Sequence, residues 1–270
     1  GGAVARVQKG DHVVVEPIVY CGECYACRQG RGNICEKLEV MGVHRDGGCQ
    51  EYFLAPEANV HKLPVELPWD EAVLIEPFTI GAQAAYRGQV QKDDFVLVMG
   101  AGTIGLTAVT MAKLAGGKVI VTDLVDDKLA YAKKCGADYA INGKTENLAE
   151  RVAEITGDMG ANVTVDAVCI KQTFEQAIDL TSAAGRVVEL SFNETPSEIA
   201  PVGIIKKELT ICGSRLQTKR FPVVIDSIKQ GKLPLAGFLS KTYPITQMAE
   251  AFEYVEKNNA TVRKVAISFE

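Results

Sequence analysis

The sequence predicts an α/β protein built on a doubly wound parallel sheet, and three observations support this class. Between residues 95 and 213, short apolar runs alternate with helical patterns, which is the order of parallel strands joined by helical crossovers. A glycine-rich turn follows the first apolar run, and Asp123 ends the second. A turn and an acid in these two places are typical of a unit that binds a dinucleotide.

The apolar runs and the helical patterns set the expected elements. The strands of the sheet are expected at 95–99, 118–123, 138–142, 162–168, 186–191 and 209–213. Helices are expected between most of them, at 103–116, 125–135, 146–156 and 172–184. After the sheet, helices are expected at 221–231 and 245–258 and a strand at 262–269, a tail that can return to the first region.

The region before the sheet has a different character. Residues 11–66 are strand-like with many turns, and the letters DGG at 46–48 predict a tight turn ahead of the strand-like run 50–54. Residues 70–87 are expected to form helices that are interrupted at Pro77, since proline cannot donate a backbone hydrogen bond.

The glycine-rich turn reads GAGTIG over residues 100–105. Gly100 permits the tight turn, Gly102 lets a diphosphate approach the backbone, and Gly105 lets the following helix pack closely on the strand. The N-terminus of that helix offers free N–H groups and a positive dipole end to phosphates. The turn therefore predicts a Rossmann unit, and the alternative interpretation is an ordinary βαβ unit that binds nothing.

Asp123 indicates which dinucleotide is bound. Its carboxylate can accept hydrogen bonds from ribose hydroxyls, and its charge repels a 2′-phosphate, which predicts NAD rather than NADP. The predicted coenzyme contacts in this region are Gly100, Gly102, Thr103, Ile104, Gly105 and Asp123.

Four of the eight cysteines stand at C-x2-C-x2-C-x7-C spacing, namely Cys21, Cys24, Cys27 and Cys35. Four thiolates this close can surround one Zn²⁺ at about 2.3 Å, and a site with no position left for water would be structural. Two disulfides are an alternative that suits a small secreted protein better. An iron–sulfur cluster is another, although its usual spacing differs after the third cysteine. The four scattered cysteines favour a reducing, cytoplasmic setting.

The bulk composition excludes several classes of protein. A hydrophobic content of 47% with 23% charged residues is typical of a soluble globular chain. No apolar run reaches the length of a membrane span. The net charge of −5 argues against a nucleic-acid partner, which would need a basic stripe. The opening GGAVARVQKG reads like the middle of a domain, so N-terminal sequence is expected to be missing.

A dinucleotide fingerprint downstream of a four-cysteine lobe is the pairing found in zinc-dependent medium-chain dehydrogenases, and this chain resembles that superfamily from end to end. The matching pieces include GDHV at 10–13, DGGCQEY at 46–52, IEPF at 75–78, CGADYAIN at 135–142 and GRVV at 185–188. Within the superfamily the chain is most similar to polyol and sugar-acid dehydrogenases of the sorbitol, galactitol, hexonate 5-dehydrogenase and starvation-sensing types. The letters GVHRDGG at 42–48 and IEPFTI at 75–80 carry this finer likeness.

The resemblance implies a domain plan and an activity. It implies a GroES-like β-barrel catalytic domain, here incomplete, with the zinc lobe at 1–78, an NAD-binding Rossmann domain at 79–227, and a C-terminal return to the catalytic domain at 228–270. The implied activity is hydride transfer to NAD from a secondary hydroxyl of a polyol or sugar acid, in a homo-oligomer that is a dimer or tetramer. A zinc-free reductase of the same superfamily and a non-catalytic NAD-binding or regulatory protein are the alternatives.

The resemblance also implies further site residues. Glu76 would be a ligand of a catalytic zinc or a base that contacts the zinc-bound water, the alternative being an acid that caps a helix. The family's other ligands, a cysteine and a His-Glu pair, would lie upstream of Gly1, so residues 1–270 alone are not expected to assemble that site.

Three basic residues complete the implied set. Lys128 would contact the adenosine ribose, and Lys264, with Arg263 as runner-up, would contact the diphosphate. Arg215 would direct its guanidinium at substrate hydroxyls or a carboxylate. The alternatives are a solvated lysine for Lys128 and a surface salt bridge for Arg215. His61 is expected at the surface.

Overall fold

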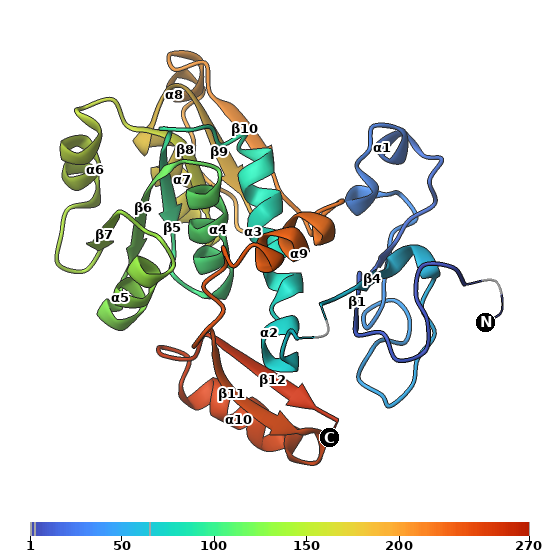
Figure 1. The fold of residues 1–270 in the computed structure, drawn as a ribbon. Coiled ribbons are helices and arrows are strands. Elements are labelled where there is room, and N and C mark those ends of the chain that lie inside the picture. Colours follow the sequence, from blue (N-terminus) through green and yellow to red (C-terminus); the bar gives the residue numbers. More distant parts are fainter. Residues whose placement is uncertain (1, 3, 65, 270) are drawn as a thin grey trace. The chain divides into compact units, whose positions relative to one another are not determined.

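The computed structural model describes residues 2, 4–64 and 66–269, and the chain divides into two compact units. Residues 80–215 form one of them, here called the sheet unit. Residues 1–79 and 216–270 together form the other, here called the split unit. Figure 1 shows the elements of both along the chain.

Six parallel strands make the sheet of the sheet unit. They are β5 (Phe95–Met99), β6 (Lys118–Asp123), β7 (Tyr139–Asn142), β8 (Ala161–Asp166), β9 (Thr181–Glu189) and β10 (Thr210–Gly213). Their spatial order is β10-β9-β8-β5-β6-β7, and every neighbouring pair is parallel. Counted from β7, this is the strand order 3-2-1-4-5-6 of a doubly wound dinucleotide-binding sheet. The predicted fold class is confirmed.

The helices of this unit lie between the strands in sequence (Figure 1). They are α4 (Thr103–Leu114), α5 (Asp126–Lys134), α6 (Leu148–Thr156), α7 (Lys171–Leu180) and α8 (Pro201–Ile205). Five of the six expected strands fall within two residues of their predicted bounds, whereas β9 begins five residues earlier than predicted.

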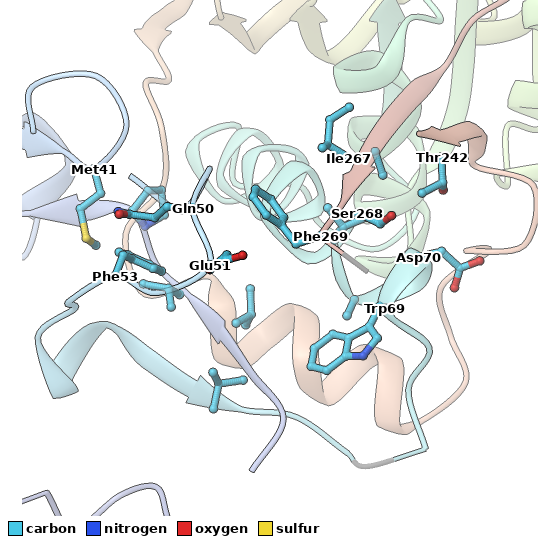
Figure 2. Close-up of a pocket in the computed structure, with 18 residues that line it drawn as sticks. Met41, Gln50, Glu51, Phe53, Trp69, Asp70, Thr242, Ile267, Ser268 and Phe269 are labelled. Atoms are coloured by element: carbon cyan, nitrogen blue, oxygen red, sulfur yellow. The ribbon is translucent and has the colours of Figure 1, made fainter. Parts of the chain in front are cut away.

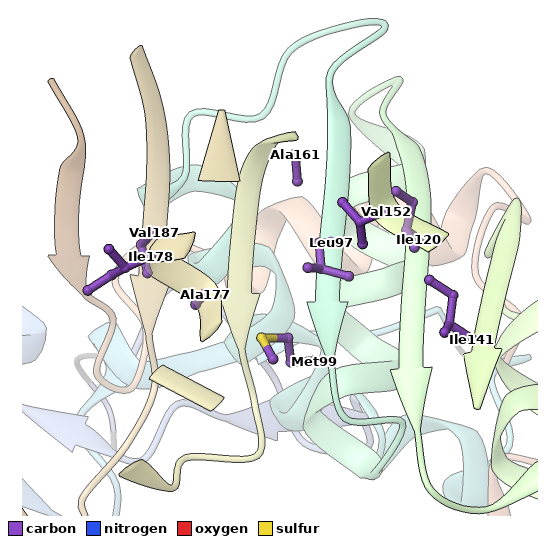
Figure 3. Close-up of a cluster of buried hydrophobic side chains, with 9 residues drawn as sticks. All are labelled: Leu97, Met99, Ile120, Ile141, Val152, Ala161, Ala177, Ile178 and Val187. Carbon is purple, nitrogen blue, oxygen red and sulfur yellow. The ribbon is translucent and has the colours of Figure 1, made fainter. Parts of the chain in front are cut away.

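The core of the sheet unit is apolar on both faces of the central strand β5. Val96, Leu97 and Val98 are all completely buried, as expected of a parallel sheet that is covered on both sides. On one face, Leu97 packs in a cluster with side chains from neighbouring strands and from α6 and α7 (Figure 3). This core holds the strands in place, and the candidate binding residues of the unit lie at the strand ends.

The helical segment before the sheet corrects one prediction. The structure has α2 (Trp69–Ala72) and α3 (Ile75–Arg87), so the break lies before Ile75 and not at Pro77. Pro77 occupies the first turn of α3, where its missing N–H breaks no hydrogen bond within the helix. Glu76 stands in the same turn, and its backbone carbonyl accepts a hydrogen bond from Thr79 Oγ1 at 2.6 Å.

The strands of the split unit form pairs. β1 (Val13–Val15) pairs antiparallel with β4 (Val60–Lys62), and β2 (Ile18–Val19) pairs antiparallel with β3 (Glu39–Val40). β11 (Leu239–Pro244) pairs parallel with β12 (Lys264–Ser268). The remaining elements are α1 (Tyr25–Arg28), α9 (Phe221–Lys229), α10 (Met248–Lys257), and the 3-10 helices η1 (Gly32–Ile34), η2 (Glu57–Asn59) and η3 (Ile245–Gln247).

The region around residues 46–54 departs from its prediction. The tight turn lies at 41–45, where Gly42 N donates to Arg45 O at 2.8 Å, and residues 50–54 form no strand. Tyr52 and Leu54 are 88% and 97% exposed. The run therefore buries neither of these apolar side chains and has no partner strand among the described residues.

A polar network joins the two stretches of the split unit, and it corrects the prediction for His61. The His61 side chain is 19% exposed, and its Nε2 lies 3.1 Å from Glu16 Oε2. Its ring stacks on Phe221 with centroids 5.1 Å apart. Gln217 donates to Glu16 Oε1 at 2.7 Å. His61 is therefore a packing residue rather than a surface one.

No helix within residues 2, 4–64 and 66–269 combines the length and the apolar character that crossing a bilayer requires.

Candidate functional site

The glycine turn after β5 is closed on one side and open on the other. Gly100 has φ +94°, a conformation that favours glycine, and a Cβ at Gly105 would lie 1.8 Å from the carbonyl oxygen of Gly100. A Cβ at Gly102 would meet no atom within 4 Å. The turn thus packs tightly against α4 and leaves its outer side free at Gly102, which suits the close approach of a diphosphate.

The same turn exposes the start of α4. The helix begins at Thr103, followed by Ile104, and its N-cap is Gly102, which has no side chain to occupy the first N–H groups. Those N–H groups and the positive end of the helix dipole form an anion site at the carboxyl end of β5.

Asp123 is fixed beside this turn by backbone donors. Its Oδ2 accepts from Ala101 N at 2.8 Å, and its Oδ1 accepts from Leu124 N and Val125 N at 2.7 and 3.1 Å. A carboxylate offers about four acceptor positions, so one remains for a ribose hydroxyl. Lys128 lies half-buried in the first turn of α5, the helix that begins three residues after Asp123.

The strand order places a crevice between the carboxyl ends of β5 and β8. The connections leave these two neighbouring strands in opposite directions along the sheet, which makes this the switch point where ligands bind in open α/β sheets. The loops that follow them are in contact, because a Cβ at Gly100 would lie 2.9 Å from Val168 Cγ2.

Two acids at this edge were missed by the sequence analysis. Asp166 ends β8, Glu189 ends β9, and the two are paired in the register of the sheet. Asp166 is completely buried; its Oδ1 accepts from Val168 N and Cys169 N at 3.0 and 3.1 Å, and its Oδ2 accepts from Thr173 Oγ1 at 2.7 Å. An acid that ends a buried apolar run is the signal that could have found each of them.

The carboxyl group of Glu189 accepts fewer hydrogen bonds than that of Asp166. Its Oε1 accepts from Ser191 N at 2.8 Å, whereas Oε2 is buried and has no hydrogen-bond partner within the described chain. Burial, and then the charge of Asp166, raise the pKa of Glu189 to about 7.

Arg215 follows the last strand of the sheet. Its side chain is exposed and lies over the ring of Phe192, with the guanidinium carbon 5.9 Å from the ring centroid. Lys264 belongs to the split unit, at the start of β12, and its charge acts on Glu76. Glu76 is half-buried, and burial raises its pKa while the charge of Lys264 lowers it.

The four-cysteine lobe has the dimensions of a tetrahedral metal site. The four Sγ atoms lie within 4.8 Å of one another, with separations of 4.0 Å for Cys21–Cys27, 3.9 Å for Cys24–Cys35 and 3.4 Å for Cys21–Cys35. A tetrahedron of sulfurs around Zn²⁺ at 2.3 Å would have edges of about 3.8 Å. These separations exceed a disulfide bond, and all four cysteines are free, so the disulfide alternative is wrong.

The lobe also provides the electrostatics that thiolate ligands need. Cys24 N donates to Cys21 Sγ at 3.4 Å, and Lys37 N donates to Cys35 Sγ at 3.2 Å. Backbone N–H groups lower the pKa of Cys21, and lower that of Cys24 to about 6, while burial raises the pKa of Cys27 to about 12. A set of thiols with N–H groups directed at their sulfurs fits zinc.

Among the described residues, this lobe is the one place where three or more potential metal-binding side chains meet. Glu76 stands outside it, so the described chain does not complete a second metal site around Glu76.

A pocket of about 920 Å³ opens in the split unit, lined by residues of β1, α2, β12 and the loop after β3 (Figure 2). Phe53, Trp69 and Phe269 give it an apolar character, and Glu51 and Asp70 are its acids. None of the sequence-predicted site residues is among the described residues that line it.

A dinucleotide-type sheet unit joined to a four-thiolate lobe defines a class, the metal-containing nucleotide-dependent oxidoreductases. Comparison with protein families gives the same answer. The family model described as zinc-binding dehydrogenase matches residues 103–230, and the one described as alcohol dehydrogenase GroES-like domain matches residues 1–65. The chain belongs to the zinc-type medium-chain alcohol dehydrogenases, as the sequence resemblance indicated.

Its relatives include polyol and sugar-acid enzymes. The chain is 39% identical to the starvation-sensing protein RspB of Escherichia coli K12, over all of this chain and 79% of the relative. It is 33% identical to L-galactonate-5-dehydrogenase of the same strain, with the same coverage. A crystal structure of an rspB alcohol dehydrogenase from E. coli CFT073 complexed with NADH superposes with a TM-score of 0.91 at 39% identity, over 97% of this chain and 80% of that one.

Proposed function

We propose that this chain is an NAD-linked dehydrogenase that oxidises a secondary hydroxyl of a polyol or sugar acid. The observation that carries the proposal is Asp123, held by three backbone N–H groups beside an open glycine turn. Similarity to an alcohol dehydrogenase that was crystallised with NADH and to a galactonate dehydrogenase supports the coenzyme and the substrate class.

The coenzyme would lie across the carboxyl edge of the sheet. Its diphosphate would bind the N–H groups at the start of α4, where Gly102 keeps the approach clear. Asp123 would accept the hydroxyls of the adenosine ribose, with Lys128 in the next helical turn as a second contact, and its charge would repel the 2′-phosphate of NADP. Lys264 would contact the diphosphate from β12.

The cysteine lobe would hold a structural zinc through Cys21, Cys24, Cys27 and Cys35, since its sulfurs and N–H donors fit that ion. Zinc in the catalytic role would lower the pKa of a bound substrate alcohol. Glu76 is the residue of this chain proposed for that role, as a ligand or as a base beside the metal. The described residues do not complete such a site.

Arg215 is the residue proposed to select the substrate. A guanidinium presents a planar set of donors that matches vicinal hydroxyls or a carboxylate. Its position over the Phe192 ring leaves the side chain exposed beyond the end of β10. We further propose that the chain forms a homo-oligomer. A cytoplasmic location is also proposed, and it agrees with the eight free cysteines, because thiols stay reduced in that compartment.

The test is the substitution Asp123→Ser, measured by NADH fluorescence titration and NADP⁺ calorimetry. Hydrogen bonds to a charged group contribute about 1.5–3 kcal/mol each, so NADH affinity should fall at least tenfold. The loss of charge should at the same time relax the discrimination against NADP⁺.

The control is Asp127→Ser, which removes the same charge from an exposed position four residues away. This variant should bind both coenzymes as the unsubstituted protein does. An unchanged coenzyme preference in Asp123→Ser would show that the ribose binds elsewhere, and inactivity of the full protein on hexitols and hexonates with NAD would contradict the substrate class.

A further inference from the structure

The two halves of the sheet carry different kinds of residue at the carboxyl ends of their strands. The half that contains β5, β6 and β7 ends in the glycine turn and Asp123, which suit the adenosine side of a dinucleotide. The half that contains β8, β9 and β10 ends in two acids. Asp166 and Glu189 are neighbours at the carboxyl edge, and Gly213 lies on the other side of Glu189. A doubly wound sheet binds one mononucleotide on each half, so these acids lie under the nicotinamide side.

The acids differ in how they are held. Each Asp166 oxygen accepts hydrogen bonds from the following loop or from α7. Glu189 has one oxygen bound to Ser191 N and one buried oxygen without a partner within the described chain. Burial of an unpaired oxygen favours the neutral form of a carboxyl group, and a positive charge nearby favours its ionisation.

The groups around Glu189 include acids and a guanidinium, since Arg87 Nε donates to the carbonyl of Gly213, the β10 neighbour of Glu189, at 3.1 Å. Asp166 faces Glu189 from β8, and the thiol of Cys169 lies in the loop after it, with Ser191 Oγ donating to the Cys169 carbonyl at 3.3 Å. On the β10 side the register partner is Gly213, which has no side chain. Arg215 follows two residues later, over the Phe192 ring.

The two redox states of the coenzyme differ by one charge at the nicotinamide ring, which is positive in NAD⁺ and neutral in NADH. We propose that Glu189 is a specificity-determining residue that makes the site favour NAD⁺ when its carboxyl group is ionised. This inference rests on the proposed NAD-linked function. Binding of NAD⁺ to the protonated enzyme releases the Glu189 proton to solvent, while binding of NADH releases none.

The pH at which this occurs is set by the environment of the acid. Burial and the charge of Asp166 raise the pKa of Glu189 to about 7, so both forms are present near neutral pH. A positive ring favours the carboxylate and lowers this pKa, so NAD⁺ affinity rises with pH. All three histidines of the chain, His12, His44 and His61, lie in the split unit, so no imidazole of the sheet unit titrates in this range.

The experiment measures NAD⁺ and NADH affinity between pH 6 and 8 by calorimetry and fluorescence. If NAD⁺ lowers the pKa by about one unit, its affinity should rise about fivefold over this interval, while NADH affinity changes less than twofold. Calorimetry at pH 7 in two buffers of different ionisation enthalpy should detect a fraction of a proton released with NAD⁺ and none with NADH.

Three variants separate this role from a structural one. Glu189→Gln keeps the shape and should abolish the pH dependence of NAD⁺ binding, and Glu189→Asp keeps a carboxyl group and should retain it. Glu194→Gln removes an exposed acid from the same loop and should behave as the unsubstituted protein does. A purely structural role would weaken NAD⁺ and NADH equally in both Glu189 variants and leave the pH dependence in place.

Two outcomes would overturn the inference in different ways. If both coenzymes bind and respond to pH identically, Glu189 does not sense the ring and the proposed function stands. If the protein takes up neither coenzyme at any pH, the proposed function is wrong and this inference is wrong with it.

Discussion

The cysteine lobe and the sheet of this chain are held together in opposite ways. In the sheet unit, the central strand is buried on both faces, and apolar side chains from five strands and two helices meet in one cluster. In the lobe, α1 has no buried residue, and the aromatic side chains of Tyr20 and Tyr25 are 45% and 68% exposed. Apolar burial therefore stabilises the sheet but contributes little to the lobe.

The other interactions that hold the lobe are polar and join residues that are close in the sequence. Its ion pair between Lys37 and Glu23 is more than 70% exposed at both side chains, and such pairs contribute about 0–1 kcal/mol. Four thiols that converge on one point without a metal would also oppose folding as they ionise. The lobe would therefore depend on a bound ion for its stability, whereas the sheet does not.

The largest effect should come from removing the metal. Exchange of Cys24 for Ser, or treatment with a strong chelator, should unfold the lobe, because binding of a structural zinc supplies on the order of 10 kcal/mol. Limited proteolysis should then cut within residues 20–37 and leave the sheet unit intact, and metal analysis should fall from one lobe zinc per chain to none.

Cys49→Ser is the matched control, because Cys49 is exposed and lies outside the cluster. It should retain both the zinc and the protease resistance. A lobe that stays equally resistant after complete loss of zinc would show that its own contacts suffice and would remove the contrast with the sheet.

The next effect tests the other side of the comparison. Leu97→Ala opens a cavity at the centre of the sheet and should lower the free energy of unfolding by about 2–5 kcal/mol, as buried leucine truncations do. Denaturant unfolding of the metal-loaded protein measures it. Leu114→Ala, at a side chain that is 39% exposed, is the control and should cost far less. Equal losses in the two variants would mean that Leu97 is not in the core.

Features encoded by neighbouring residues could be predicted from the sequence. The bounds of β5 and β6 are as predicted, because each is built around one continuous apolar run. The same holds for the glycine turn and for the convergence of the four cysteines, where spacing alone limits the geometry. The roles of Glu76, Lys264 and Arg215 stay predictions, because they concern contacts with bound ligands rather than contacts within the chain.

Features that depend on distant partners could not be predicted. β11 was missed because Ser240, Lys241 and Thr242 interrupt its apolar pattern, and it is stabilised by pairing with β12. The acid pair was missed for a similar reason, since only the register of β8 with β9 places Glu189 beside Asp166.

The smallest effect concerns that acid pair, where burial of Glu189 costs the sheet unit stability. In the unfolded chain Glu189 loses its proton near its ordinary pKa of 4.5, whereas in the folded protein it keeps the proton until the pKa of about 7. Between these values the folded state binds more protons than the unfolded state, so stability falls as pH rises from 4.5 to 7.

Glu189→Gln removes this penalty. The variant should match the unsubstituted, coenzyme-free protein at pH 4 and be more stable by about 1–2 kcal/mol at pH 8, after the effect is reduced for the half-exposed side chain. Denaturant unfolding at both pH values measures the difference, with Glu194→Gln as the control. If Glu189→Gln is no more stable than the unsubstituted protein at pH 8, the ionised carboxyl group of Glu189 does not lower the free energy of unfolding. The sheet unit would then lose no stability at its carboxyl edge.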